Sequence, residues 1–535
     1  MRRDQGFLLP PDMREWLPAD HLVWFLLEVI AAMDTSVFAR RPRRREQGPD
    51  TGSTAGRAGY DPDLLLGLLI YAYANGLQSS RRIERLCHTD VAFRVLCAGD
   101  IPDHTVIARF RAAHQEKFVE VFAQVLRLCA RAGLGQVGTV AIDGSKFTGD
   151  ASPGANHGRD WFARQAAERV EAAAATDAAE GQRLDAGGDP EGGDRGPAGW
   201  AEQGAGDRQA RIQTCLAELE DAGQSAQADL TAKAAKLEVR VQAREADVAR
   251  LRAEQQTKID RWHQGWADHR ARPLFYYAPQ GACPRPVDKA VVVVRAEAAL
   301  ARARAKAEHL ARQLAAASAE PQAGSGSGSG SGAGVLRNLT DPDSRLMKTR
   351  RGWTQGYNVQ FVVSDDQLVL AVRATNDPFD GAWFTPMTQA AVAAAVEIAL
   401  ARDPQACPGE HGGIGVVLAD AGYASHANLT APGPDRLIAL GKGRAVERAA
   451  REHPAEGEPP PEATARERMD HRLRTPEGRA TYKRRGATVE PGIGNVKKLL
   501  ARITRRGLAA ADAEVTLAAL AHNLRKLHRL HAAPT

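Results

Sequence analysis

The stretch Val137-Gly-Thr-Val-Ala-Ile-Asp143-Gly-Ser-Lys-Phe147 decides the fold class, because it has the composition of a buried β-strand that carries an acid. Its β-branched residues favour an extended, buried conformation. Asp143 follows the apolar run, where desolvating a carboxylate is expensive unless a cation lies beside it. The sequence therefore predicts a sheet with a charged functional group at the end of this strand.

A second apolar run repeats the pattern far along the chain. Gly415-Val-Val-Leu-Ala-Asp420-Ala-Gly-Tyr423 carries Asp420 at its end, and Gly422 gives the backbone room to turn. Hard divalent ions such as Mg²⁺ bind one or two carboxylates together with phosphate oxygens and water. Two such ions about 4 Å apart activate the attacking oxygen and stabilise the leaving oxygen in phosphodiester chemistry.

A third acid lies in a basic stretch near the C-terminus, Tyr482-Lys-Arg-Arg-Gly-Ala-Thr-Val-Glu490-Pro-Gly-Ile-Gly-Asn-Val-Lys497-Lys498. Residues 472–506 contain eleven Lys or Arg and two acids, a bias typical of a phosphate-binding surface. We expect Glu490 at the start of a helix, with Lys497 and Lys498 two turns further on. The predicted catalytic and metal-binding acids are Asp143, Asp420 and Glu490.

Each acid also has an ordinary structural interpretation. An Asp after a strand is often a turn-former or a helix cap, and a Glu in a first helical turn complements the helix dipole. The ordered set of strand-Asp, strand-Asp and helix-Glu favours the catalytic interpretation. The competing acids lie in polar or loop-like segments and rank below: Asp150, Asp365, Asp366, Asp377 and Asp380.

The order Asp, Asp, Glu resembles the DDE transposases of bacterial insertion sequences, and within them the group with a Tyr-Arg-Glu-Lys signature. Tyr482, Arg485, Glu490 and Lys497 match that signature in residue type. The gap from Arg to Glu is one residue longer than in the signature, so Arg484 is a second candidate for the Arg.

Three further segments, 141–145, 419–423 and 521–526, are similar to this family, and the resemblance covers about residues 1–150, 335–445 and 465–530. It implies a ribonuclease-H-like core, a mixed sheet flanked by helices with the acids at one end. It also implies two Mg²⁺ (or Mn²⁺) ions and a homodimer on double-stranded DNA, comprising terminal inverted repeats and target. The residues implied to bind DNA are Tyr482, Arg484, Arg485, Lys497 and Lys498.

The order of predicted elements independently indicates an α/β core. The expected strands are 137–147, 356–364, 368–374, 414–420 and 436–441, with a turn at 365–367 and an alanine-rich helix at 386–401.

Composition and cysteine usage favour a large cytoplasmic protein, and the resemblance implies association with the bacterial nucleoid. The chain has 535 residues, 43% hydrophobic content and a net charge of +6. Its six cysteines form no CxxC pair and no zinc-finger spacing, so we expect no disulfide framework. The N-terminus lacks an apolar h-region, and no uninterrupted apolar run reaches about 18 residues, which predicts no membrane partner.

The N-terminal region, 1–135, is predicted to be an all-α DNA-binding domain. Apolar spacing indicates helices at 22–33, 62–75, 80–87, 90–96 and 104–130. Exposed arginines are typical of a helix-turn-helix-like domain, and those expected are Arg81, Arg82, Arg85, Arg109 and Arg111. An ordinary helical bundle on the core is the alternative. Five arginines in 40–45 suggest an additional DNA-binding arm.

The remaining chain divides into the first part of the core, 136–151, a helical insertion, 152–346, and the rest of the core with basic helices, 347–535. Residues 216–251 and 290–314 indicate a helical hairpin or antiparallel coiled coil. An acidic glycine-rich segment, 177–195, and a Gly-Ser tract, 324–332, flank it. Dimerisation and DNA contact are both open roles. For Trp262, Trp266 and Trp353 we expect packing rather than base stacking.

Three functions fit these observations. The first is a DNA transposase that cuts element ends and joins them to target DNA by metal-dependent phosphoryl transfer. The second is a metal-dependent DNA nuclease without strand transfer. The third is a catalytically inactive, transposase-derived DNA-binding protein, against which the intact acids argue.

Overall fold

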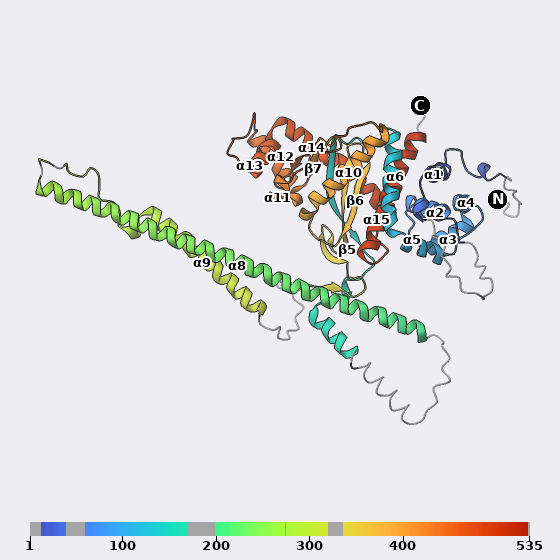
Figure 1. Cartoon of the computed structure of the whole chain (residues 1–535), viewed down its shortest axis with the longest axis horizontal. Helices are drawn as coiled ribbons and strands as arrows, with labels where there is room; N and C mark the ends of the chain where they lie inside the picture. Colours follow the sequence, from blue (N-terminus) through green and yellow to red (C-terminus); the bar gives the residue numbers. More distant parts are fainter. Residues whose placement is uncertain are drawn as a thin grey trace, which may run out of the picture. The chain divides into compact units, whose positions relative to one another are not determined.

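The computed structural model describes residues 12–38, 59–169, 171, 198–272, 274–275, 277–318 and 335–532 (Figure 1). The predicted basic arm at 40–45, the acidic segment at 177–195 and the Gly-Ser tract at 324–332 lie outside these residues. The chain forms two compact units. One comprises residues 1–156 and 337–535, and the other comprises 157–336.

The N-terminal part of the first unit is helical, as predicted, with α1 (Leu22–Ala31), α2 (Pro62–Ala74), α3 (Ser80–Thr89), α4 (Val91–Cys97), α5 (His104–Ala113) and α6 (Phe118–Arg131). Asp61 caps α2 by accepting from the Asp63 amide at 2.9 Å, with Pro62 at the first helical position. The long helix expected at 104–130 is wrong, because the 3₁₀ turn Gln115–Lys117 divides it into α5 and α6.

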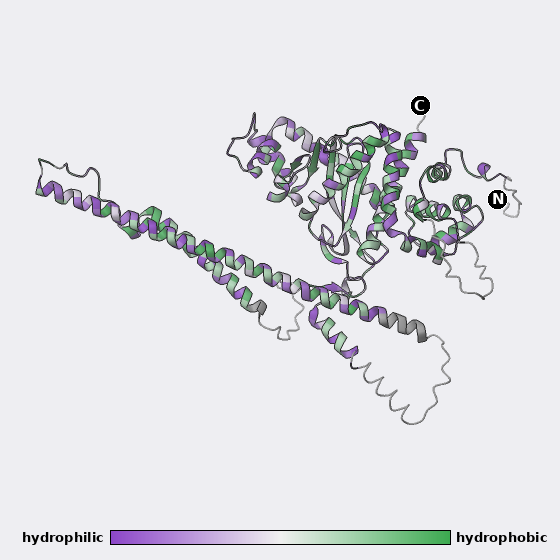
Figure 2. Cartoon of the chain, viewed as in Figure 1, coloured by the Kyte–Doolittle hydropathy of each residue, from purple (hydrophilic) through white to green (hydrophobic). Residues whose placement is uncertain are grey.

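A mixed six-stranded sheet forms the centre of the first unit. The resemblance implies such a mixed sheet, and the sequence pattern predicts five of its six strands but not β4. Its strands are β1 (Thr139–Thr148), β4 (Arg345–Thr349), β5 (Gly352–Ser364), β6 (Val369–Thr375), β7 (Val416–Ala419) and β8 (Asp435–Ile438). The strands run in the order β4-β5-β1-β7-β8, and β6 also pairs with β5. β5 is antiparallel to β1, whereas β7 is parallel to both β1 and β8. The hydropathy colouring shows apolar residues gathered in this sheet and the helices against it (Figure 2).

Helices from the C-terminal half cover the sheet. They are α10 (Phe384–Arg402), α11 (His426–Thr430), α12 (Gly443–Glu452), α13 (Ala465–Arg474), α14 (Pro476–Leu499) and α15 (Leu508–Ala532). α10 packs on β5 and β6, α14 on β1 and β5, and α15 on β6, α6 and α2. The helix Gly381–Arg402 is, by length and composition, apolar enough to cross a membrane. Its packing on the sheet is that of a core helix.

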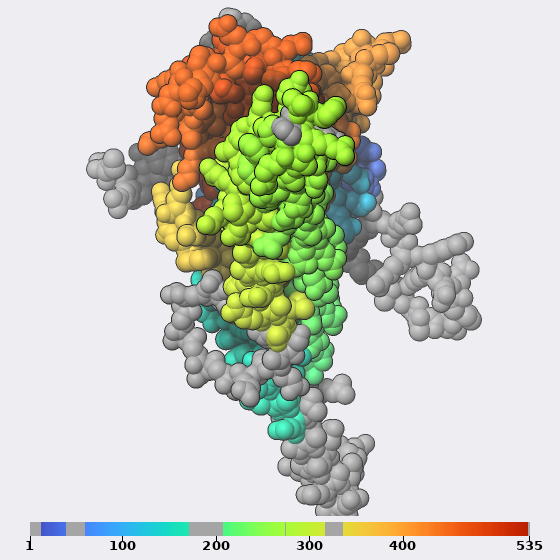
Figure 3. Space-filling model, turned by 90° about the vertical axis from the view of Figure 1, so that its left-hand side faces the viewer, coloured from blue at the N-terminus to red at the C-terminus, as the bar shows by residue number. Residues whose placement is uncertain are grey.

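The second unit contains two long helices, α8 (Ala198–Ala271) and α9 (Val291–Ser318), which lie side by side (Figures 1 and 3). Ion pairs Arg252–Glu297 and Arg304–Glu245 show that they run antiparallel, at 2.5 and 2.7 Å. Trp262 and Trp266, on α8, are partly buried beside each other with ring centroids 6.0 Å apart. Trp353 does not pack as expected, because it is 65% exposed at the start of β5.

The chain segments that lead into and out of the second unit lie close together within the first. β2 (Asn156–His157) precedes that unit and β3 (Arg337–Asn338) follows it. The Asn338 amide donates to the Ser152 carbonyl at 2.8 Å and to the Asn156 side chain at 3.3 Å. Residues 157–336 therefore interrupt the core without separating β1 from β5. All six cysteines lie in the described ranges, and none forms a disulfide.

Candidate active site

Parallel pairing of β1 with β7 brings Asp143 and Asp420 to corresponding positions. Ala141 lies opposite Leu418, and the same register continued by two residues aligns Asp143 with Asp420. Asp143 is not at the end of its strand, as the sequence suggested, because β1 continues to Thr148 in antiparallel pairing with β5. It lies where the pairing with β7 has ended, so the two acids still meet at one edge.

Arg485 of α14 lies between these two acids. Its Nη2 is 2.9 Å from Oδ2 of Asp143 and 4.0 Å from Oδ2 of Asp420. Burial raises the pKa of Asp143 to about 6, an effect that Arg485 opposes and that the neighbouring Asp420 and Asp380 reinforce. Tyr482 lies one turn before Arg485 on α14. Burial raises the pKa of the Tyr482 hydroxyl, Arg485 opposes this shift, and Asp420 and Asp143 add to it. The signature residues Tyr482 and Arg485 thus face the two strand acids.

A third acid, Asp380, joins this cluster. Its Oδ1 accepts from Asn358 Nδ2 at 2.8 Å and from Gln360 Nε2 at 2.7 Å, both on β5. Lys146 Nζ lies 3.8 Å from the same oxygen. The sequence pattern ranked Asp380 low because it lies in a loop-like segment before α10. The structure shows that two polar residues of β5, Asn358 and Gln360, hold the Asp380 carboxylate beside the site. Nothing in the local sequence around these two residues indicates which acid they contact.

Two glycines allow these carboxylates to approach one another. A Cβ added at Gly144 would overlap the Asp380 carboxylate. A Cβ at Gly422 would lie 3.0 Å from Asp420 Oδ1 and 3.4 Å from Asp380 Oδ2. Gly422 also donates its amide to Asp420 Oδ1 at 2.9 Å, which orients that side chain. Any larger residue at either position would push the acids apart.

Glu490 occupies a different place from the one expected. α14 begins at Pro476, so Glu490 lies in the middle of the helix and not in its first turn. The dipole interpretation is thereby removed, since that effect fades beyond the first turn. Its side chain is exposed and has no ion-pair or hydrogen-bond partner among the described residues. Asp143, Asp420 and Glu490 do not form a set whose ligand atoms all lie within 4.8 Å of one another.

The basic stretch that looked nearly free of acids is largely paired in the fold. Six of the eleven Lys and Arg residues in 472–506 contact carboxylates from other segments or from the helix before, namely Arg472, Arg474, Arg484, Arg485, Arg502 and Arg506. Arg484 pairs with Asp365 and donates to Thr139 Oγ1 at 3.3 Å. Lys497 donates to the Lys146 carbonyl at 3.1 Å and lies over the Phe147 ring. Lys498 is exposed.

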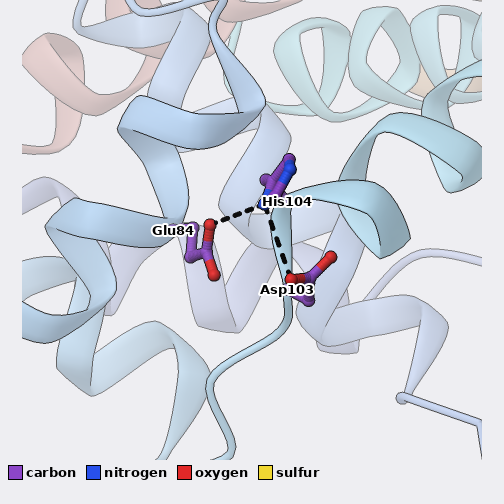
Figure 4. A group of neighbouring side chains, drawn as sticks. All are labelled: Glu84, Asp103 and His104. Atoms are coloured by element: carbon purple, nitrogen blue, oxygen red, sulfur yellow. Dashed lines mark hydrogen bonds and ion pairs between the residues drawn. The ribbon is translucent and has the colours of Figure 1, made fainter. Parts of the chain in front are cut away.

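In the described parts of the chain, one group of three His, Cys, Asp or Glu residues places its ligand atoms within 4.8 Å, and it lies in the N-terminal helices: Glu84, Asp103 and His104 (Figure 4). His104 Nδ1 is 2.9 Å from Glu84 Oε2, which ties the start of α5 to α3. Asp103 caps α5 by accepting from the Thr105 amide at 2.7 Å. Capping and helix pairing account for these contacts.

The arginines of the N-terminal helices divide into two sets. Arg81, Arg82, Arg85 and Arg109 are exposed, as expected for a DNA-binding face. Arg111 was expected to be exposed and is instead 8% exposed. Its Nη1 donates to the Gln78 carbonyl at 2.7 Å and to the Tyr73 hydroxyl at 3.2 Å. It therefore joins helices and does not face solvent.

Two segments of the chain match known protein families. The family described as Transposase domain (DUF772) matches residues 11–113, the region of α1 to α5. The family described as Transposase DDE domain matches residues 449–528, which include α13, α14 and most of α15. Searches of curated proteins and of solved structures returned no match.

The matched segments cover 103 and 80 of the 535 residues, and both carry transposase descriptions. Together they support a DDE-type transposase of insertion sequences. A DDE transposase domain implies enzymatic activity on a DNA substrate, with divalent metal ions as the general cofactor of the family. The family matches leave the individual site residues to be argued from the geometry.

Proposed function

We propose that this chain cuts the ends of an insertion sequence and joins them to target DNA by metal-dependent phosphoryl transfer. The observation that carries the proposal is the convergence of Asp143 and Asp420, from two parallel strands, around Arg485 of the helix that also bears Glu490. The strand order of the mixed sheet supports the ribonuclease-H-like core that the resemblance implies. The Tyr-Arg-Glu-Lys signature is supported by Arg485, whose side chain faces the acids whereas Arg484 pairs elsewhere.

The donor set fits a hard divalent cation. Asp143, Asp420 and Glu490 offer carboxylate oxygens, the ligand type that Mg²⁺ and Mn²⁺ prefer. The Arg485 guanidinium lies between the two aspartates, so positive charge is already required there, and its buried Nε has no hydrogen-bond partner in the described structure. The unpaired Glu490 remains available as the third ligand. Two bound ions would supply an activated attacking oxygen and charge stabilisation for the leaving oxygen.

The protein's own side chains would hold the DNA around these acids. Tyr482, Arg485 and Lys497 lie on α14 and would orient phosphates near the scissile bond, with Arg484 a lesser contributor because of its ion pair. Lys498, in the last turn of α14, would also bind DNA. The exposed arginines of α3 and α5 would bind the terminal repeats in a helix-turn-helix-like manner. The insertion, 152–346, would act as a coiled-coil-like arm in a homodimer that pairs two element ends on nucleoid DNA.

The test is incubation of the purified protein with a labelled duplex of the DNA that flanks its reading frame. With Mg²⁺ or Mn²⁺ we expect end-specific nicks followed by strand joining. Asp143→Ala, Asp420→Ala and Glu490→Ala should each abolish cleavage and retain DNA binding, because each removes a metal ligand and leaves the basic surface intact. Efficient cleavage by one of these variants would remove that residue from the triad.

The same assay separates the two alternative functions. Cleavage without joined products would identify a metal-dependent nuclease. DNA binding without cleavage under all metal conditions would identify an inactive transposase-derived DNA-binding protein.

A further inference from the structure

A pocket of about 310 Å³ lies between α14 and α15, away from the acid cluster. Four cationic side chains line it: Lys498 from the last turn of α14, and Arg525, Lys526 and Arg529 from α15. No acidic residue lines the pocket. This part of the described structure therefore combines a concave shape with a single sign of charge.

None of the four cations forms an ion pair with a carboxylate among the described residues. Arg525 makes one protein contact through its guanidinium, to the Ala74 carbonyl at the end of α2, at 2.8 Å. The basic stretch at 472–506 differs, because six of its cations are already paired. Unpaired positive charge is therefore concentrated at this pocket.

The arrangement is unfavourable for the isolated protein. Arg525 and Arg529 are spaced i, i+4 on α15, and Lys526 and Arg529 are spaced i, i+3, so like charges are neighbours on one helix surface. Compensation of the helix dipole does not explain them all. That effect is confined to the last turn, whereas Arg525 and Lys526 precede the end of α15 at Ala532 by seven and six residues. An anionic ligand would remove the repulsion.

The other polar groups that line the pocket are the side-chain amides of Asn495 and Gln367 and the imidazole of His522. The amide NH2 groups can donate hydrogen bonds to a ligand, although that of Gln367 also donates to the Ala487 carbonyl at 3.5 Å. Nearby backbone acceptors are already engaged, since the Leu499 carbonyl accepts from Gln78 at 2.7 Å and the Gln367 carbonyl lies 3.2 Å from His522 Nε2. A ligand rich in acceptor oxygens fits such a surface, and a phosphate group is the common example.

We propose that this pocket binds a backbone phosphate of the DNA substrate at a distance from the reacting bond. The inference rests on the proposed function, which supplies DNA as the ligand. α14 links the two places, because Arg485 contacts the acids and Lys498 lies thirteen residues later. At about 1.5 Å per residue this spacing is roughly 20 Å, or about six base pairs of duplex along the helix.

The position also connects the pocket to the N-terminal DNA-binding helices. Gln78, which donates to the Leu499 carbonyl, lies two residues before α3 and its exposed Arg81 and Arg82. Arg525 caps α2, the helix that precedes this link. A phosphate held here would therefore lie next to the segment that carries the helix-turn-helix-like face, and would fix the register of an element end between that face and the acids.

The experiment compares the full-length protein with Lys526→Ala/Arg529→Ala, and with a control, Arg444→Ala/Arg448→Ala, which removes the same charge from exposed positions of α12. Fluorescence anisotropy with the labelled flanking duplex is measured from 50 to 300 mM salt. Each lost phosphate contact lowers the salt slope by about 0.9. Because the pocket holds one phosphate, the pocket variant should lose about 0.9 unit of slope, and the control should keep the wild-type slope.

Thermal unfolding checks that the pocket variant is folded, and Lys498→Ala, which changes the other helix, should lower the slope by about one unit in the same assay. A slope in both pocket variants equal to that of the control would overturn the proposal. A second arm uses 10 mM inorganic phosphate as the probe. Thermal stabilisation by phosphate without a change in the DNA slope would show a site for small phosphates and would also overturn it.

Failure of the proposed function has a different signature. It appears as absence of metal-dependent cleavage in the wild-type protein, whereas failure of the pocket appears as unchanged salt dependence in variants of a protein that binds and cuts DNA.

Discussion

Replacing Asp143 by Asn tests the central feature of the site, a buried carboxylate that we propose to bind a divalent cation. Burial raises the pKa of Asp143 from its ordinary 3.8 to about 6, even with Arg485 at 2.9 Å. At about 1.36 kcal/mol for each tenfold change in proton affinity, the ionised side chain destabilises the metal-free fold by roughly 3 kcal/mol. Asp143→Asn should therefore stabilise the metal-free protein at pH 7.5 by about 1–3 kcal/mol.

The pH dependence gives this prediction a sign. Below pH 3.8 the carboxyl group is neutral in both folded and unfolded states, so it carries no penalty. Between pH 3.8 and about 6 the unfolded state releases its proton first, and the stability of the wild type falls relative to the variant. Above about pH 6 the difference is constant. Thermal or urea unfolding in EDTA from pH 4 to 8 measures it, with Asp229→Asn on the exposed surface of α8 as the control.

Metal ions should reverse the order of stability. Mg²⁺ or Mn²⁺ at a hundredfold excess over its dissociation constant should stabilise the wild type by about 2.7 kcal/mol, and should have little effect on Asp143→Asn. The stabilisation should weaken below pH 6, because the ligand is then protonated. A metal-free Asp143→Asn protein that is less stable than wild type at pH 7.5 would refute the reasoning, since it would show that the Arg485 ion pair outweighs the burial of the charge.

Three further predictions concern single residues. Glu490→Gln should abolish cleavage and change the unfolding free energy by less than about 0.5 kcal/mol, because its side chain is exposed and unpaired; parallel cleavage and urea unfolding assays measure both. Asp380→Ala should destabilise by about 2 kcal/mol and slow cleavage more than tenfold, because two buried amides lose their acceptor; wild-type kinetics in this variant would contradict the role. Arg111→Ala should destabilise by about 3 kcal/mol by thermal unfolding, because its buried hydrogen bonds to Tyr73 and Gln78 are lost; a change in DNA affinity without a change in stability would indicate instead a direct DNA contact.

The sequence was sufficient for the elements whose signals are local. The strand runs around Asp143 and Asp420, the helix α2 and the alanine-rich α10 all form close to where their patterns place them. Apolar periodicity and capping depend on neighbouring residues, so they can be recognised in a single chain.

Charge balance was the part that the sequence represented poorly. The stretch at 472–506 contains two acids, yet Asp365, Asp435 and Asp150 reach it from distant segments and neutralise several arginines. Whether an Arg faces solvent depends on its partners in space, which is why Arg111 was misplaced. The sequence also placed the start of α14 too late. Gly486 and Pro491 disfavour a helix interior, yet tertiary packing keeps α14 continuous through both residues.

The sequence by itself determined the strand and helix pattern of an α/β core, the resemblance to transposases and the positions of two acids beside strands, because strand patterning and motif chemistry are encoded by adjacent residues. Tertiary structure alone decided which side chains share a site. It placed Asp380 beside Asp143, where the absence of a side chain at Gly144 leaves room for the Asp380 carboxylate. It also brought unpaired cations from α14 and α15 together in one pocket. The physical reason is that electrostatic energies depend on distance and burial, and both are set by contacts between residues far apart in the chain.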